Sequence, residues 1–184
     1  MRNQGQICTA TSRILVHESL YAEYIAQFLE TVRTVSKVGD QWDDSVYQGP
    51  QVTRAQYDRV RSLIDVGVSE GAALAMGGQW EREEIFGPVV CIPSFGTEEE
   101  AIRRANDTVY GLGAAIFTTD LQRALRVAPA IQAGMVWVNS SQDCDFRIPF
   151  GGVKQNGSGR ELGEAGLEAY TTVQAIHVNM GWKL

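Results

Sequence analysis

Short apolar runs alternate with amphipathic segments along most of this chain, and this alternation constrains its fold more than any other feature. Three continuous apolar runs have the composition of buried strands, at residues 89–93, 113–118 and 135–139. Three segments have apolar residues spaced by three and four, as in helices, at residues 19–37, 53–70 and 120–128. This order predicts an α/β fold with a mainly parallel sheet flanked by helices.

Local signals predict where some of these segments begin and end. Thr97, followed three residues later by Glu100, forms a capping box, which predicts a further helix that begins there and ends near Asn106. Pro129 is predicted to stop the helix before it, because proline has no N–H for the helical ladder. The 184 residues show no internal repeat and no linker-like stretch, so we expect one domain over residues 1–184.

Charge and hydropathy argue against two classes of partner. The 16 basic and 22 acidic residues give a net charge of -6, which repels nucleic acid phosphates and anionic lipids. No apolar run approaches the roughly 20 residues that span a bilayer, and the first residues are polar where a signal peptide is apolar. Three cysteines without metal-like spacing fit reduced thiols. We therefore expect a cytoplasmic protein that binds neither nucleic acid nor membrane and has no metal site.

Each of the three cysteines is a different kind of candidate nucleophile. Cys8 lies among small residues that leave its sulfur accessible, a weak signal when taken alone. Cys91 lies within an apolar run and is predicted to be core. Cys144 lies between Asp143 and Asp145, whose charges disfavour a thiolate, so we expect a poor nucleophile.

Two other candidate motifs favour structural roles. A cysteine protease needs a histidine base, but neither His17 nor His177 has a signature around it, so a surface or core role is the expectation for both. The glycines of residues 157–163 do not form a dinucleotide fingerprint. The third glycine falls one position late, and no strand leads directly into the loop.

Four segments carry motifs that are specific in combination. They are residues 3–13 (NQGQICTATSR), 83–89 (EEIFGPV), 134–139 (GMVWVN) and 149–161 (PFGGVKQNGSGRE). In this order they resemble the C-terminal catalytic half of the NAD(P)-dependent aldehyde dehydrogenase superfamily, over nearly the whole chain.

The resemblance implies roles for individual residues. It places Cys8 at the thiol that attacks the aldehyde and Glu84 at the carboxylate that grips the nicotinamide ribose, with Phe86 beside the nicotinamide ring. In the absence of nicotinamide, Glu84 would be free for acid or base catalysis. The expected substrate pocket surrounds four side chains: Ile7, Thr9, Phe146 and Phe150.

Family members add a thiolate to the aldehyde, pass hydride to NAD(P) and hydrolyse the thioester with a glutamate-activated water. The Rossmann domain, the catalytic asparagine and the glutamate base have no counterpart in this sequence, and the stretch after Gly78 is shorter than in the family. We therefore expect a truncated protein with a vestigial cofactor site at Glu84 and Phe86, which binds no cofactor alone and cannot by itself oxidise an aldehyde.

Three hypotheses follow for the function. The first is a remnant that uses its pocket for cofactor-free chemistry on an aldehyde or other carbonyl compound, such as thiol addition, hydrolysis, cyclisation or isomerisation. The second is the catalytic half of a dehydrogenase whose cofactor domain is on another chain or is omitted from this sequence. The third is a non-catalytic subunit that only oligomerises.

The end of the chain predicts how copies of it associate. Residues 171–178 are rich in β-branched side chains and have no obvious strand partner within the chain. The preceding residues resemble the start of the strand by which family members join subunits. We expect a homo-oligomer that forms through a strand at residues 168–180.

Overall fold

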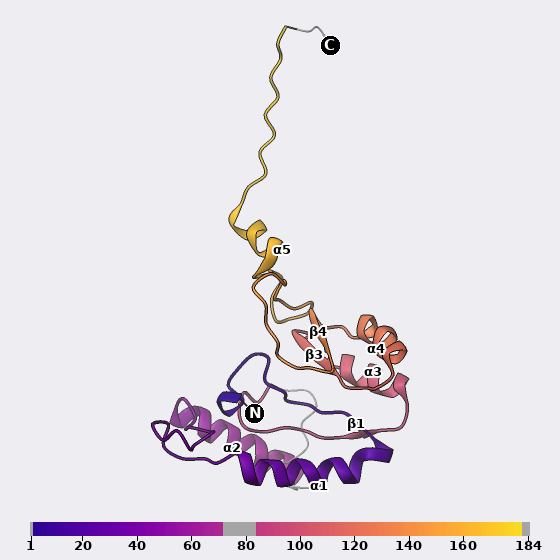
Figure 1. Cartoon of the computed structure of the whole chain (residues 1–184). Coiled ribbons are helices and arrows are strands. Elements are labelled where there is room, and N and C mark those ends of the chain that lie inside the picture. Colours follow the sequence, from indigo (N-terminus) through magenta and orange to yellow (C-terminus); the bar gives the residue numbers. More distant parts are fainter. Residues whose placement is uncertain (1, 72–83, 182–184) are drawn as a thin grey trace.

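The computed structural model describes residues 2–71 and 84–181. In these ranges the helices are α1 Glu18–Val35, α2 Arg54–Ser69, α3 Glu98–Asn106, α4 Leu121–Val127 and α5 Gly163–Leu167. The strands are β1 Val16–His17, β2 Ser94–Phe95, β3 Gly113–Ile116 and β4 Met135–Val138. Single turns of 3₁₀ helix are η2 Ala128–Ala130 and η3 Glu168–Tyr170, whereas η1 Arg2–Gly5 is a turn in which Asn3 and Gln4 have left-handed dihedral angles. In Figure 1, α1, α2 and β1 lie at one end of the body, and β3, β4, α3 and α4 lie beside them.

All four strands pair in parallel, which confirms the α/β fold. They form two separate two-stranded sheets, β1 with β2 and β3 with β4, rather than the one sheet that we expected. The apolar run at 89–93 extends the first pairing, since Cys91 N–H donates to Ser12 O at 2.9 Å and Ile14 N–H donates to Cys91 O at 2.8 Å. Only an isolated bridge between Arg13 and Cys91 results, so this run is not the full strand that its composition predicted.

Side-chain caps fix where the longer helices begin. Thr97 caps α3 by accepting the N–H of Glu100 at 3.2 Å, as the capping box predicted. The Glu100 carboxylate accepts the N–H of Gly96 at 2.9 Å, one residue before the expected partner. Thr53 caps α2 and Asp120 caps α4 in the same way.

A small apolar core lies under α2. Val60 of this helix packs with Ile85 and Val89, and all three side chains are at most 6% exposed. Leu63 and Ile64 pack against this group from the same helix face. The core therefore joins α2 to the segment that follows Glu84.

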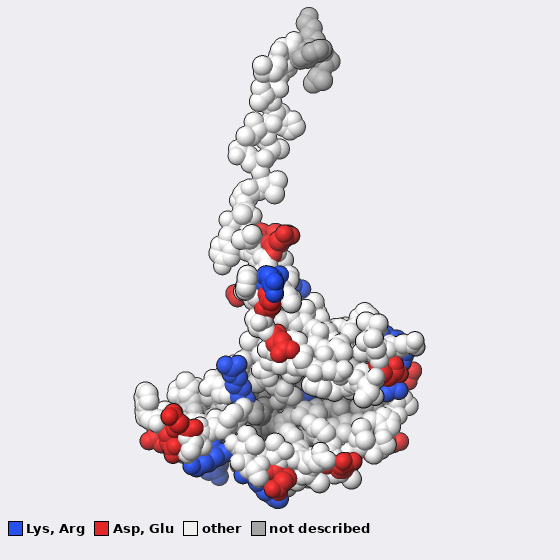
Figure 2. Space-filling view, in the orientation of Figure 1, with Lys and Arg blue, Asp and Glu red and all other residues white. Residues whose placement is uncertain are grey.

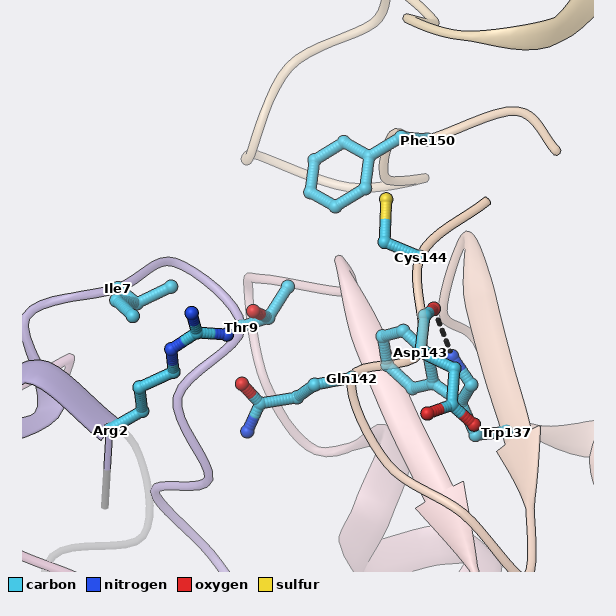
Figure 3. Close-up of a pocket in the computed structure, with 8 residues that line it drawn as sticks. All are labelled: Arg2, Ile7, Thr9, Trp137, Gln142, Asp143, Cys144 and Phe150. Carbon is cyan, nitrogen blue, oxygen red and sulfur yellow. Dashed lines mark hydrogen bonds between the residues drawn. The ribbon is translucent and has the colours of Figure 1, made fainter. Parts of the chain in front are cut away.

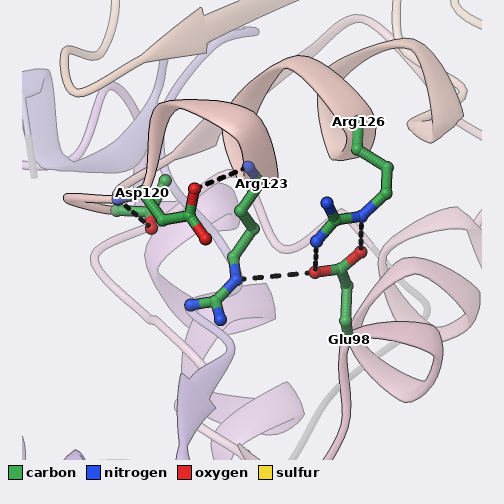
Figure 4. Close-up of polar contacts among 5 residues, drawn as sticks. Glu98, Asp120, Arg123 and Arg126 are labelled. Atoms are coloured by element: carbon green, nitrogen blue, oxygen red, sulfur yellow. Dashed lines mark hydrogen bonds and ion pairs between the residues drawn. The ribbon is translucent and has the colours of Figure 1, made fainter.

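Helices α3 and α4 are joined by ion pairs (Figure 4). Arg126 donates Nε and Nη2 to the Glu98 carboxylate at 2.7 and 2.8 Å, and Arg123 Nε lies 3.5 Å from the same carboxylate. The hydrogen bonds from Arg126 lower the pKa of Glu98 from its ordinary value. This carboxylate therefore stabilises the contact between the two helices only while it is ionised.

The C-terminal end of α3 holds two distant segments. Arg13 donates to the carbonyls of Arg104 and Ala105, at 3.1 Å in both cases. Lys154 Nζ donates to the carbonyl of Asn106, the last helical residue, at 2.7 Å, and to a second carbonyl just beyond the helix at 3.0 Å. Cations are favoured at this end because the last carbonyls have no helical partners. One helix end thus anchors the segment after Cys8 and the glycine-rich loop.

The chain exposes more surface than a compact protein of its size. Its accessible area is 13,247 Å², whereas a compact monomer of this mass exposes about 8,800 Å². Part of the excess comes from residues 171–181, which project from the body (Figure 1) and carry no Asp, Glu, Lys or Arg (Figure 2). In the described part of the chain, no helix combines the length and apolar character needed to cross a membrane.

Residues 171–180 have no strand partner within the described chain, and the predicted strand does not begin at 168, because Glu168–Tyr170 form η3. Val173 is 99% exposed and Ile176 is 78% exposed. An edge strand that pairs only with a second copy stays a prediction.

Candidate functional site

Cys8 lies in a tight turn and is exposed. Ala10 N–H donates to Ile7 O at 2.8 Å, which places Cys8 and Thr9 at the centre of the turn. No group of the described residues accepts the backbone N–H of Cys8, which is usual for a central residue of such a turn. The thiol and an unused N–H donor therefore belong to the same residue.

A cavity of about 190 Å³ lies beside this turn (Figure 3). Arg2, Ile7 and Thr9 line one side, so two of the lining residues flank Cys8 in the chain. Phe150 lines the other side together with residues that belong to or follow β4, namely Trp137, Gln142, Asp143 and Cys144. The structure thus brings together three of the four predicted pocket residues around one cavity.

The loop that carries Phe150 is closed on itself. Phe150 N–H donates to Glu161 O at 2.7 Å, and Glu161 N–H donates to Phe150 O at 2.8 Å. Arg160 Nη1 donates to Gly152 O at 2.7 Å within the same loop. A Cβ on Gly134 would overlap the backbone of Gly151, so β4 and the loop approach each other as closely as glycine allows. These contacts hold the aromatic ring over the cavity.

The fourth predicted pocket residue, Phe146, does not line this cavity. Its ring is 76% exposed and lies 5.7 Å from the Arg147 guanidinium. Arg147 also binds the Asp145 carboxylate through two side-chain hydrogen bonds, of 2.9 and 2.6 Å, and these bonds lower the pKa of Asp145. Contact between Phe146 and a substrate stays a prediction.

Glu84 and Phe86 are exposed and lie at the start of the second described range, residues 84–181. Glu84 N–H donates to the Tyr110 hydroxyl at 3.1 Å, and Phe86 has a left-handed backbone with φ 53°. Gln56 of α2 donates to Ile85 O at 3.2 Å and to Phe86 O at 2.9 Å. Neither Glu84 nor Phe86 lines the cavity beside Cys8. The shortened stretch after Gly78 lies outside the described residues.

The remaining cysteines and a histidine have identifiable surroundings. Cys91 is 5% exposed, which confirms a core position. Cys144 is exposed and lines the cavity, with its Sγ directed toward Phe150 in Figure 3. His17 caps α1 by accepting the N–H of Ser19. Among the described residues, no group of three or more His, Cys, Asp or Glu side chains could hold a metal ion.

Five lining residues were not identified from the sequence: Arg2, Trp137, Gln142, Asp143 and Cys144. A usable signal exists for the last three, since they follow the end of β4. Ligands of parallel α/β sheets bind outside the carboxyl ends of the strands. Arg2 carries no comparable signal.

Comparisons with known proteins find aldehyde dehydrogenases that match nearly the whole chain. The sequence matches the model of the aldehyde dehydrogenase family over residues 1–83 and 79–176. It is 43% identical to an aldehyde dehydrogenase-like protein of Schizosaccharomyces pombe, over 207 aligned positions that cover 100% of this chain and 42% of that protein. It is 41% identical to a betaine aldehyde dehydrogenase of Atriplex hortensis, covering 94% of this chain and 39% of the relative.

The fold also matches solved structures of an aldehyde dehydrogenase. The fold matches apo betaine aldehyde dehydrogenase of Staphylococcus aureus with a TM-score of 0.93 and 35% identity, over 99% of this chain and 41% of that one. The same S. aureus enzyme in complex with NAD⁺ matches with a TM-score of 0.92 and 35% identity, again over 99% of this chain and 41% of that one. The chain therefore spans about two fifths of the length of the proteins that it matches.

Proposed function

The chain belongs to the aldehyde dehydrogenase family, and from that premise we propose that Cys8 is a nucleophile which adds to an aldehyde held in the cavity beside it. The observation that carries the proposal is that two distant segments line one cavity: Ile7 and Thr9, on either side of Cys8 in the chain, and Phe150. Cys8 itself is not among the lining residues. An aldehyde or another small carbonyl compound is the substrate class, because a family cysteine of this kind reacts with a carbonyl carbon.

The residues of this chain perform the addition in one balanced step. The Cys8 sulfur bonds to the carbonyl carbon, the carbonyl π electrons move to its oxygen, and the thiol proton ends on that oxygen, which gives a thiohemiacetal. The N–H of Cys8, unused by other described residues, is a donor for the developing oxyanion. Phe150 and Ile7 supply apolar walls that hold the substrate and exclude water.

Oxidation requires a further group. A bound nicotinamide would supply the acceptor for the hydride that leaves the carbonyl carbon. The exposed carboxylate of Glu84 and the exposed ring of Phe86 suit the ribose and the nicotinamide face, and Gln56 fixes the backbone between them. We propose that these residues hold only that end of the cofactor, so oxidation by this chain alone is not expected.

Chemistry that needs no hydride acceptor is the alternative within the same proposal. Thiol addition, hydrolysis, cyclisation and isomerisation of a carbonyl compound all begin with the Cys8 step. The exposed, uncharged segment 171–181 supports a homo-oligomer as the working form. Oligomerisation is also all that the third hypothesis requires, and in that hypothesis Cys8 would have no chemical role.

The test combines thiol protection with an oxidation assay. Iodoacetamide labelling is followed at each cysteine by peptide mass spectrometry, with and without betaine aldehyde or benzaldehyde. We expect the aldehyde to slow labelling of Cys8, and Phe150→Ala to weaken that protection. Cys144 lines the cavity, so a bound aldehyde also shields it; absence of protection at Cys8, with or without protection of Cys144, would contradict the proposal. NADH absorbance after addition of NAD⁺ then separates oxidation from cofactor-free chemistry.

A further inference from the structure

Residues 2–6, which lead into the turn of Cys8, have an unfavourable backbone. Asn3, Gln4 and Gly5 all have left-handed dihedral angles, with φ of 50°, 57° and 71°. Residues with a Cβ seldom adopt this region and persist there only when their surroundings dictate it. The turn closes on itself through Gln6 N–H, which donates to Asn3 O at 3.0 Å. Two exposed side-chain bonds cross the same turn, from Asn3 Nδ2 to Gln6 O and from Gln6 Nε2 to Asn3 O, both at 3.2 Å. These local, exposed bonds are weak support for a segment that precedes the nucleophile.

The additional support comes from residues 48–56, far away in the sequence, which we name the amide bracket. Gln4 N–H donates to Gln48 Oε1 at 2.9 Å, and Gln4 Nε2 donates to the carbonyl of Gly49 at 2.6 Å. Gln4 and Gln48 are 7% and 5% exposed. A third bond joins the same two stretches of chain, since Val52 N–H donates to Gln6 Oε1 at 2.9 Å. Because buried amides must find partners, these bonds specify one arrangement of the segment.

The same bracket also holds the second site segment. Gln56 Nε2 donates to the carbonyls of Ile85 and Phe86, next to Glu84. Gln48 and Gln56 are separated by a few residues that include the Thr53 cap of α2, whose Oγ1 accepts Gln56 N–H at 3.1 Å. The two arms of the bracket therefore start from one locally ordered element.

We propose that Gln48 and Gln56 are positioning residues: Gln48 fixes the strained turn that presents Cys8, and Gln56 fixes the backbone beside Glu84. The roles of Cys8 and Glu84 rest on the proposed function, whereas the bracket itself rests on the hydrogen bonds above. Neither glutamine lines the cavity beside Cys8.

Amide hydrogen exchange of the intact chain tests the proposal through Gln48→Met, which keeps the side-chain length but removes the acceptor of Gln4 N–H. We expect exchange in residues 2–10 to accelerate by about tenfold, as for loss of one buried hydrogen bond, while α3 changes by less than about twofold. Iodoacetamide labelling of Cys8 should change by at least about threefold while buried Cys91 stays protected. Gln56→Met should accelerate exchange in residues 84–91 and not in residues 2–10.

Two further variants keep the test decisive. Gln27→Met makes the same chemical change on the exposed face of α1, where, among the described residues, its side-chain amide bonds only to Glu23, and it should alter neither segment. Gln6→Met removes the bond from Val52 together with the bond from Gln6 Nε2 to Asn3 O, and is the milder variant should Gln48→Met fail to fold; it should accelerate exchange in residues 2–10 by about threefold.

Unchanged exchange in residues 2–10 would overturn the proposal. An equal acceleration in α3 would also overturn it, because that result would show a general loss of stability. Failure of aldehyde to protect Cys8 would refute the proposed function and leave the exchange result standing. The two claims are therefore separable.

Discussion

A methyl group added at Gly87 should destabilise the chain by a definable amount. An ideal Cβ at Gly87 would lie 2.5 Å from Cγ2 and 3.1 Å from Cγ1 of Val60. Gly87 is buried and its φ lies outside the left-handed region, so Gly87→Ala introduces a packing conflict without backbone strain. Val60 is a β-branched residue in α2 with one preferred rotamer, so its methyl groups cannot rotate away cheaply. Overpacking of this kind costs about 1–3 kcal/mol.

A double-mutant cycle measures this conflict. Val60→Ala alone should cost about 2 kcal/mol, because it removes two methyl groups from a 5% exposed site. In the double variant the new methyl occupies the space that Val60 leaves, so its stability should match that of Val60→Ala, with a coupling energy of about 1–3 kcal/mol.

Urea unfolding followed by circular dichroism gives the four free energies of unfolding. Gly159→Ala is the matched control, because a Cβ there meets nothing within 4 Å, and it should change the free energy of unfolding by less than about 0.5 kcal/mol. Strictly additive effects of Gly87→Ala and Val60→Ala, or a Gly87→Ala variant as stable as the parent, would refute the packing of residues 85–89 on α2.

Three further predictions concern other parts of the molecule. Lys154→Met leaves carbonyls at the end of α3 without their charged donor and should lower the free energy of unfolding by about 2 kcal/mol, measured by urea unfolding; an unchanged value would contradict the role of this anchor. Because Arg126 lowers the pKa of Glu98, the ionised carboxylate adds stability above its ordinary pKa of 4.5, and this stability is lost as the pH falls through the lower folded value. The melting temperature of Glu98→Gln should therefore lie below that of the parent near neutral pH and converge with it in acid; a constant gap would contradict the assignment. Val173→Lys with Ile176→Lys should reduce the molar mass by light scattering, if residues 171–180 join copies of the chain, and an unchanged oligomer would refute that prediction.

The ends of helices could be predicted because their signals are local. Thr97 with Glu100, and Thr53 with the spacing that follows it, identify the starts of α3 and α2 from a few adjacent residues. Strand pairing depends on residues far apart in sequence, and here the alternation predicted parallel pairs but not their division into two small sheets. The run at 89–93 has strand composition, yet only Cys91 finds a bridge partner within the described chain.

The candidate site was predictable where motifs exist and not elsewhere. Cys8, Ile7 and Phe150 were identified through their segments, and the structure places the latter two around one cavity. Arg2 reaches the same cavity only through folding, since it lies in no motif that specifies a role, whereas the position of Gln142 after the end of β4 is a signal that the sequence prediction did not use. Glu84 as an acid or base and Phe146 as a substrate contact stay predictions, as do the single domain, the terminal strand and a cytoplasmic location.

A crystal structure of the protein treated with an aldehyde shows whether Cys8 forms a bond with a substrate in the cavity. We expect continuous electron density from the Cys8 sulfur to the former carbonyl carbon, with the carbonyl oxygen within hydrogen-bond distance of the Cys8 N–H and the substrate tail against Phe150. Cys8→Ser crystals treated identically should show no such bond. Density attached to Cys144 instead, or an aldehyde bound away from this cavity, would show that Cys8 is not the nucleophile of this site.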